Sequence, residues 1–517
     1  MTFEIVFVLL SLLGMVAALI ADKMRPGMIL FSVVVLFLCA GILTPKEMLE
    51  GFSNKGMITV ALLFLVSEGI RQSGTLGQVI KKLLPQGKTT VFKAQLRILP
   101  SVAFISAFLN NTPVVVIFAP IIKHWAKSVN LPATKFLIPL SYVTILGGIC
   151  TLIGTSTNLV VHGMILEAGF EGFSMFELGK VGIFIAIAGI IYIFLFSKRL
   201  LPDARPDTAV PDEEVEEGEK LHRVEAVLGA RFPGINKKLK DFNFQRHYGA
   251  EVKEIKTRNG QRFVSNLEEV VLHEGDTLVV MADDTFIPTW GESSVFVLLT
   301  NGNEPDTTGK KKRWFALLLL VLMIVGATVG ELPVTKEMFP DIKLDMFFFV
   351  SITTIIMAWT NLFPARKYTK YISWDILITI ACAFAISKAM VNSGVADCVA
   401  GFIIGLSDDY GPHVLLAILF VITNLFTELI TNNAAAALAF PLALSISAQL
   451  GVSPTPFFVV ICMAASASFS TPIGYQTNLI VQGIGNYKFT DFVRIGLPLN
   501  IITFLISVIL IPLIWNF

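Results

Sequence analysis

The chain alternates long apolar segments with short polar ones. Six apolar segments approach the ~20 residues that an α-helix needs to span a bilayer. They are Phe3–Ala21 and residues 27–43, 178–196, 315–330, 344–362 and 495–514. This pattern predicts an all-α polytopic membrane protein.

Four polar interruptions divide the remaining apolar sequence into shorter arms. Two are tips, at residues 110–113 and 431–434, and each has an arm on either side that is too short to span a membrane. That pattern predicts two re-entrant hairpins. The other two, at residues 154–158 and 471–478, interrupt longer apolar segments. They predict two helices that break part-way through the membrane, where polar backbone must be buried by protein or line a cavity.

The interruptions recur in the same order in two halves of the chain. Residues 154–163 match residues 474–483 at a shift of 474 − 154 = 320, and the Asn pair at 110–111 matches the pair at 432–433 at a shift of 432 − 110 = 322. An odd number of crossings in each half would invert the halves about the membrane plane. Polar breaks at matching places in inverted repeats favour a substrate site over Asn residues that only cap half-helices.

Composition argues against several other classes of protein. Of the 517 residues, 54% are hydrophobic and only 15% are charged, whereas soluble chains are nearer a quarter charged. The net charge of +1 gives no indication of nucleic-acid binding. The five cysteines lack paired spacing, so neither disulfides nor a cysteine metal site is expected. No nucleophile–base pair or nucleotide loop appears, so the chain is not expected to be an enzyme.

A segment with the composition of a soluble protein separates the first membrane repeat, residues 1–200, from the second, residues 315–517. Residues 201–220 are rich in Pro, Asp and Glu and predict a solvated linker. Residues 221–300 predict a small α/β domain, and residues 301–314 a basic linker. Because basic residues flank the domain on both sides, the positive-inside rule places residues 201–314 in the cytoplasm.

The periodicity within the inserted domain predicts its elements. Strands are expected at residues 224–228, 250–256 and, as the last strand, 275–281, with a turn at 258–260 and a short amphipathic helix at 235–242.

The polar interruptions carry neutral oxygen and nitrogen groups. Asn oxygens and Ser or Thr hydroxyls are hard donors that suit Na⁺, while amide, hydroxyl and backbone N–H groups suit an oxyanion. Neither tip contains Lys or Arg, so helix dipoles and co-bound cations would balance an anion's charge. This predicts cation coupling. The second break has Tyr475 and Gln476 where the first has Thr155 and Ser156, so the predicted cavity is asymmetric.

Two acidic residues lie within apolar segments. Glu68 is near the end of one, and an ion pair with Arg71 is favoured over a transport role. Glu428 lies four residues before Asn432. A role near the ions is favoured for it over a purely structural pair with a lysine, and proton transfer stays open.

At these residues the chain resembles the divalent anion/sodium symporters, the solute carrier 13 type of the ion transporter superfamily. The motifs are Leu109-Asn-Asn-Thr-Pro113, Leu152-Ile-Gly-Thr-Ser-Thr-Asn158, Thr427-Glu-Leu-Ile-Thr-Asn-Asn-Ala434 and Thr471-Pro-Ile-Gly-Tyr-Gln-Thr-Asn478. Dicarboxylate members carry Ser-Asn-Thr at both tips. The second tip here, aligned as Asn432-Asn-Ala434, has lost its Thr, so the sequence is more similar to the sulfate branch. Residues 238–249, 258–260 and 272–279 resemble a TrkA C-terminal-type (RCK C) regulatory domain.

Carried over position by position, the resemblance implies one substrate site and two Na⁺ sites. The substrate site would comprise Asn111, Thr112, Asn433, Thr155, Thr157 and Thr477. One Na⁺ site would comprise Ser106, Asn110, Asn111 and Gly154, and the other Thr431, Asn432, Asn433 and Gly474. The resemblance further implies an elevator mechanism in a homodimer of the bacterial inner membrane, with Na⁺ as coupling ion and no other cofactor. A nucleotide is among the ligands that the inserted domain would take.

These expectations favour Na⁺-coupled symport of sulfate. A Na⁺/dicarboxylate symporter, or a Na⁺/H⁺ antiporter that uses Glu428 as proton carrier, remains an alternative within the superfamily. A ligand-gated channel is a third alternative, which the paired re-entrant tips disfavour.

Overall fold

The computed structural model of the protein describes residues 3–21, 24–85, 87–203, 222–229, 231–257, 261–283, 286–290, 295–300, 310–339, 341–405 and 411–517. Most of the predicted acidic and basic linkers, and the predicted turn at 258–260, lie outside the described residues.

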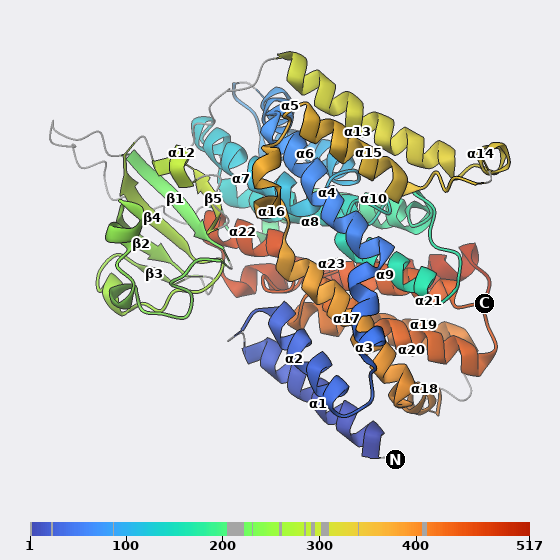
Figure 1. The fold of residues 1–517 in the computed structure, drawn as a ribbon. Helices are drawn as coiled ribbons and strands as arrows, with labels where there is room; N and C mark the ends of the chain where they lie inside the picture. Colours follow the sequence, from blue (N-terminus) through green and yellow to red (C-terminus); the bar gives the residue numbers. More distant parts are fainter. Residues whose placement is uncertain are drawn as a thin grey trace, which may run out of the picture.

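The fold is mostly helical, and a small sheet lies at one edge of the helical body (Figure 1). Before the sheet come α1 (Phe3–Ala21), α2 (Pro26–Cys39), α3 (Pro45–Glu50), α4 (Lys55–Gln72), α5 (Thr75–Leu83), α6 (Val91–Ser106), α7 (Asn111–Ser128), α8 (Leu137–Gly148), α9 (Ser156–Glu167) and α10 (Gly179–Leu200). After it come α13 (Lys310–Gly330), α14 (Pro333–Met338), α15 (Met346–Trp359), α16 (Tyr368–Tyr371), α17 (Trp374–Asn392), α18 (Val395–Gly405), α19 (Gly411–Leu429), α20 (Asn432–Leu450), α21 (Thr455–Ser466), α22 (Gln476–Gly485) and α23 (Phe489–Ile514). Eight helices of the described residues are long and apolar enough to cross a membrane, which confirms a polytopic membrane protein.

A helix forms on each side of both predicted tips, with α6 and α7 around the first and α19 and α20 around the second. At 19 residues each, α19 and α20 are long enough to cross a membrane, so the expectation that these two arms are too short to span was wrong. At each tip the chain is extended for one residue, Asn110 in the first hairpin and Thr431 in the second, and the next residue begins a helix. Pro113 falls in the first turn of α7. There its missing N–H removes no hydrogen bond of the helix, so it favours a helix start at this point.

The two halves interlock through their helices. Helix α2 packs on α17 of the other half, and α15 packs on α4. Nearer the centre, α9 packs on α20 and α22 packs on α7. Each broken helix therefore lies against the hairpin of the opposite half, which brings the four polar interruptions together.

The inserted sheet has five strands in the order β3-β2-β4-β1-β5, and all of its pairings are antiparallel. The strands are β1 (His222–Leu228), β2 (Glu251–Lys256), β3 (Arg262–Phe263), β4 (Thr277–Ala282) and β5 (Phe296–Thr300), with the short helices α11 (Phe244–Tyr248) and α12 (Phe286–Trp290). Phe232, Tyr248 and Phe296 pack together in its separate core.

Two predictions for this domain were wrong. No helix spans residues 235–242, because only a 3₁₀ turn at Leu239–Asp241 forms there and the helix begins at Phe244. Asn243 sets this start, since its side chain accepts a hydrogen bond from the backbone N–H of Arg246. The strand predicted as the last is followed by β5, which pairs with β1.

The inserted domain docks on α7 and α22 (Figure 1). Lys123 of α7 donates to both carboxylate oxygens of Glu225 on β1, each at 3.0 Å. Val227 of β1 is buried in the core of the membrane helices. A Cβ added at Gly483 of α22 would lie 2.5 Å from the hydroxyl oxygen of Thr277, so glycine permits this close approach. The domain thus attaches to two helices whose first residues lie at the polar interruptions.

The ion pair at this interface stays charged over a wide pH range. Burial alone would raise the pKa of the Glu225 carboxyl, but Lys123 and Lys256 beside it lower that pKa to about 2. Because this pKa lies below the ordinary carboxyl value, the stabilisation is complete above the ordinary value of 4.5 and is lost only as the pH falls through about 2.

We therefore expect Lys123→Met to loosen the docked domain without unfolding the membrane helices. A hydrogen-bonded ion pair of this kind contributes about 1.5–3 kcal/mol. Amide hydrogen exchange in β1, measured by mass spectrometry, should accelerate by about tenfold or more. Lys127→Met, an exposed position one turn further along α7, is the control. Loosening of the unmodified protein between pH 7 and pH 5 would contradict the assignment to Glu225.

Candidate functional site

Each hairpin tip contacts the broken helix of the other half. At the first tip, the amide nitrogen of Asn111 donates to the hydroxyl of Tyr475 at 2.6 Å, and Thr112 donates to the side-chain oxygen of Gln476 at 3.3 Å. At the second tip, Asn433 accepts weak hydrogen bonds from Ser156 and Thr157, at 3.3 and 3.4 Å. The tips and breaks predicted from sequence therefore form one cluster of neutral polar groups.

Inside each hairpin, a hydroxyl in the first arm holds the asparagine that begins the second arm. The one hydroxyl proton of Ser106 is shared between the amide oxygen of Asn111, at 2.8 Å, and the carbonyl of Thr144, at 2.9 Å. That of Thr427 is shared in the same way between the amide oxygen of Asn432, at 3.2 Å, and the carbonyl of Ala465, at 2.6 Å. These two arrangements are equivalent, and they fix how the halves align.

The structural alignment of the tips corrects the sequence alignment by one residue. The paired positions give 432 − 111 = 321 and 427 − 106 = 321, whereas the sequence match was made at 322. Two consecutive Asn residues allow either register, so the letters alone did not decide it. Thr112 consequently aligns with Asn433 and not with Ala434, so the second tip still lacks a threonine at this position and carries an asparagine in its place.

The two breaks are held open by the same pair of residues in each half. Thr151 accepts from the backbone N–H of Gly154, and Asn158 donates to the carbonyl of Thr151 at 2.9 Å. In the second half, Thr471 accepts from Gly474, and Asn478 donates to the carbonyl of Thr471 at 3.1 Å.

The shift at the breaks is 471 − 151 = 320, as the sequence match predicted. These threonines and asparagines satisfy backbone groups that the broken helices leave free.

Oxygen atoms gather at each break around a glycine. A Cβ added at Gly154 would lie 2.5 Å from the carbonyl oxygen of Gly148, and one at Gly148 would lie 2.6 Å from the amide oxygen of Asn111. At Gly474, an added Cβ would lie 2.5 Å from the carbonyl oxygen of Thr427. Carbonyl, amide and hydroxyl oxygens are the ligands of hard cations, so both places have the donors that Na⁺ needs.

The hydroxyl of Thr431 is buried and has no hydrogen-bond partner among the described residues. It lies at the second tip, beside Asn432. A buried hydroxyl without a partner is costly, and a bound ion or anion would satisfy it.

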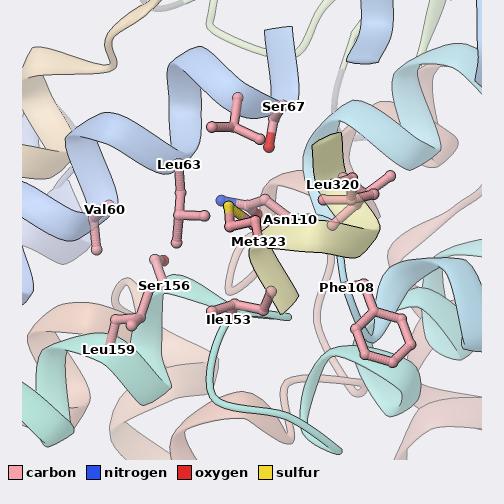
Figure 2. A pocket seen from close by; sticks show the side chains of 12 residues that line it. Val60, Leu63, Ser67, Phe108, Asn110, Ile153, Ser156, Leu159, Leu320 and Met323 are labelled. Atoms are coloured by element: carbon pink, nitrogen blue, oxygen red, sulfur yellow. The ribbon is translucent and has the colours of Figure 1, made fainter. Parts of the chain in front are cut away.

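Three predicted residues lie at the edge of the cluster. The Thr155 hydroxyl is 2.9 Å from that of Tyr475. The Thr477 hydroxyl accepts a hydrogen bond from Ser141 of α8, at 2.8 Å. Asn110 lines a pocket with apolar walls from α4, α13 and the first break, and Figure 2 shows its side chain among those that point into it.

Glu428 is hydrogen-bonded to the backbone of the second break. One carboxylate oxygen accepts from the backbone N–H of Ser470 at 2.8 Å and from the side-chain amide of Asn500 at 2.7 Å. The other accepts from the backbone N–H of Thr471 at 2.8 Å. Its charge is met by these donors. Glu68, by contrast, pairs with Arg71 at 2.6 Å, as predicted.

Sequence reasoning missed several residues of the cluster. Tyr475 and Gln476 were noted for asymmetry and were not assigned to the site, although both bond the first tip. Ser141 is a lone hydroxyl in an apolar helix, and its bonds to Thr477 and Asn478 depend on tertiary contacts. Alignment of the repeats was the available signal for Tyr475, because the equivalent residue, Thr155, was in the predicted site.

Interlocked helical halves, paired helical hairpins and paired broken helices that meet in a neutral polar cluster are typical of a polytopic membrane transporter. The sequence profile of a family described as citrate transporter matches residues 16–448 and 343–517 of the chain. The chain therefore belongs to the citrate transporter family. Because this is a family of transporters, the expectation that the chain is not an enzyme is confirmed.

Individual relatives agree with the family. The chain is 30% identical to an uncharacterized transporter of Synechocystis, over 94% of this chain and 93% of the relative. It is 23% identical to a protein of Chlamydomonas reinhardtii named probable sodium/sulfate cotransporter 3, over 93% and 85%. It is also 30% identical to that organism's sodium/sulfate cotransporter 2, over 54% of this chain and 31% of the relative.

We expect Asn111→Ala and Asn432→Ala to impair transport to a similar extent, because both asparagines begin the second arm of a hairpin and are held by equivalent hydroxyls. Loss of a hydrogen bond to a charged ligand costs about 1.5–3 kcal/mol, so initial uptake at low substrate should fall by at least tenfold. Asn392→Ala, an exposed asparagine away from the cluster, is the control. A folded Asn432→Ala variant with normal uptake, beside an inactive Asn433→Ala variant, would refute the structural alignment.

Proposed function

We propose that the protein is a Na⁺-coupled symporter of a small divalent oxyanion, and that sulfate is its substrate. The observation that carries this proposal is the central cluster, which is built from two hairpin tips and two broken helices and contains no Lys or Arg at residues 107–113, 149–158, 427–434 or 467–478. Helix N-termini at Asn111, Ser156, Asn432 and Gln476 supply N–H groups for an anion.

Co-bound cations would supply the positive charge that the tips and breaks lack. Asn111 and Gly154 at the first break, and Asn432, Thr431 and Gly474 at the second, are the proposed Na⁺ ligands. The gathered oxygens and the unpartnered Thr431 hydroxyl support this assignment. The relatives named sodium/sulfate cotransporters support both the ion and the anion.

The alternatives differ in ligand and coupling. A dicarboxylate or citrate symporter agrees with the description of the family. A Na⁺/H⁺ antiporter would use Glu428 as proton carrier. The three strong hydrogen bonds that Glu428 accepts from Ser470, Thr471 and Asn500 favour a fixed structural carboxylate instead.

Uptake into proteoliposomes tests the proposal. With an inward Na⁺ gradient, radiolabelled sulfate should accumulate, and replacing Na⁺ with K⁺ should abolish the accumulation. Ser101→Ala, which removes an exposed hydroxyl of α6 that bonds only its own helix, should leave uptake unchanged. Succinate or citrate uptake without sulfate uptake would overturn the substrate. Na⁺-driven proton movement in the absence of any anion would favour the antiporter.

We further propose that the hairpins and broken helices move together, as the transport unit of an elevator, against the remaining helices of a homodimer. The inserted domain, which we propose is a cytoplasmic TrkA C-terminal-type regulatory module open to a ligand such as a nucleotide, would travel with that unit. Its contacts support this, because Glu225 and Thr277 bind to α7 and α22, the helices that begin at the first tip and the second break.

Disulfide cross-linking in a cysteine-free background distinguishes moving from fixed neighbours. Leu63 on α4 and Ile153 at the first break line the same pocket (Figure 2). Oxidising a cysteine pair at these positions should stop uptake, and a reductant should restore it. A pair replacing Lys123 and Glu225 should leave uptake at more than half of its reduced value, since both partners move together. Normal uptake with the Leu63–Ile153 positions cross-linked would contradict the proposed movement of the transport unit. Loss of uptake with the Lys123–Glu225 positions cross-linked would show that the inserted domain does not move with that unit.

A further inference from the structure

One side chain breaks the symmetry of the cluster more than any other. Tyr475 precedes α22, and the equivalent residue before α9 is Thr155, at 475 − 155 = 320. The backbones at the two positions are nearly identical, with φ and ψ of −134° and 131° at Tyr475 and of −137° and 145° at Thr155. The difference between the two breaks at this point is therefore one of side chain alone: a phenol ring in place of a methyl and a hydroxyl.

The phenol of Tyr475 crosses from its own break to the first hairpin tip. Its hydroxyl accepts a hydrogen bond from the amide nitrogen of Asn111 at 2.6 Å, and lies 2.9 Å from the hydroxyl of Thr155. The residue is 8% exposed, so the ring is packed between the elements that it joins. A threonine at this position would be too short to reach Asn111.

The ring therefore fills space beside the first hairpin tip and the first break, within the proposed substrate site. Its hydroxyl also occupies the amide nitrogen of Asn111, which is a donor that a bound anion would otherwise be able to use. A phenol hydroxyl can both donate and accept a hydrogen bond. Tyr475 accepts one from Asn111 here, and it can donate its own proton to a bound anion. The ring of Tyr475 leaves no room for a longer molecule unless the ring moves.

We propose that Tyr475 sets the size limit of the ligand, so that the site takes a compact tetrahedral oxyanion and excludes dicarboxylates and tricarboxylates with a carbon chain. This inference rests on the proposed function, since it concerns the same site. It assigns the choice of substrate to the second break, and not to the composition of the hairpin tips. The physical reason is steric: a packed ring resists displacement, because interiors at native density have no free volume to receive it.

The purified full-length protein in detergent gives the primary test, through thermal stabilisation by a series of anions in saturating Na⁺: sulfate, succinate and citrate. A ligand that binds the folded state and not the unfolded state raises the unfolding temperature, because it stabilises the fold by RT ln(1 + [L]/Kd). The parent should be stabilised by sulfate only. Tyr475→Thr, which gives both breaks the same residue, should be stabilised by succinate, with an apparent affinity at least tenfold above that of the parent.

Two further variants separate size from hydrogen bonding. Tyr475→Phe keeps the ring, so it should still exclude succinate and citrate while its sulfate affinity falls by several-fold with the lost hydroxyl. Thr155→Tyr adds a second ring and should abolish sulfate binding as well. Tyr368→Thr, at a half-exposed tyrosine on α16, is the matched control and should behave like the parent.

The outcomes distinguish this inference from the proposed function. A Tyr475→Thr variant that unfolds at the parental temperature and still ignores succinate would overturn the size limit, as would a Tyr475→Phe variant that accepts succinate. If Tyr475→Thr does not fold, Tyr475→Leu, which lacks the ring but keeps an apolar side chain, takes its place under the same criteria. If the parent binds succinate and not sulfate, the proposed substrate fails and the size limit fails with it. If the parent binds sulfate but uptake ignores Na⁺, only the coupling fails.

Discussion

The need to satisfy polar backbone inside a membrane constrains this fold more than any other interaction. Each broken helix leaves carbonyl and N–H groups that lipid cannot hydrogen-bond, and an unmet group there costs several kcal/mol. Asn158 and Asn478 donate hydrogen bonds to equivalent carbonyls in the two halves, and Thr151 and Thr471 accept hydrogen bonds from equivalent backbone N–H groups. Because these backbone groups are hydrogen-bonded, the breaks are stable, and the remaining polar atoms can bind a ligand.

The interlocking of the halves follows from the same requirement. A single half could not enclose its own tip, because α7 needs α22 and α20 needs α9 as its neighbour. Bonds across the halves, from Asn111 to Tyr475 and from Ser156 to Asn433, then join the four interruptions into one cluster. Burial of the site is thus a property of the repeat pair, and binding a ligand there depends on contacts that neither half makes alone.

The existence of the elements was predictable from sequence, because each depends on local apolar length and on the residues that interrupt it. A helix forms in each of the six predicted spanning segments, and the chain is interrupted at the four predicted places, although α2 and α15 have only 14 residues each. Most of what failed depended on pairing over distance, whereas the helix start at Phe244 is set locally by the Asn243 cap. The register of the tips was ambiguous by one between adjacent asparagines. The helix expected at 235–242 was replaced by a 3₁₀ turn, and β5 was found only as a partner of β1. The donors to Glu428 lie on segments 42 to 72 residues away.

Glu428 has no equivalent in the first half, since 428 − 321 = 107 places Ala107 there. A carrier made of two identical inverted halves would face the two sides of the membrane in conformations related by a two-fold rotation about an axis in the membrane plane, and these would have equal free energy. Glu428 is hydrogen-bonded to the second break and has no counterpart at the first, so the two conformations differ in free energy. The empty protein should accordingly rest with unequal populations of its two orientations, even when no gradient acts on it.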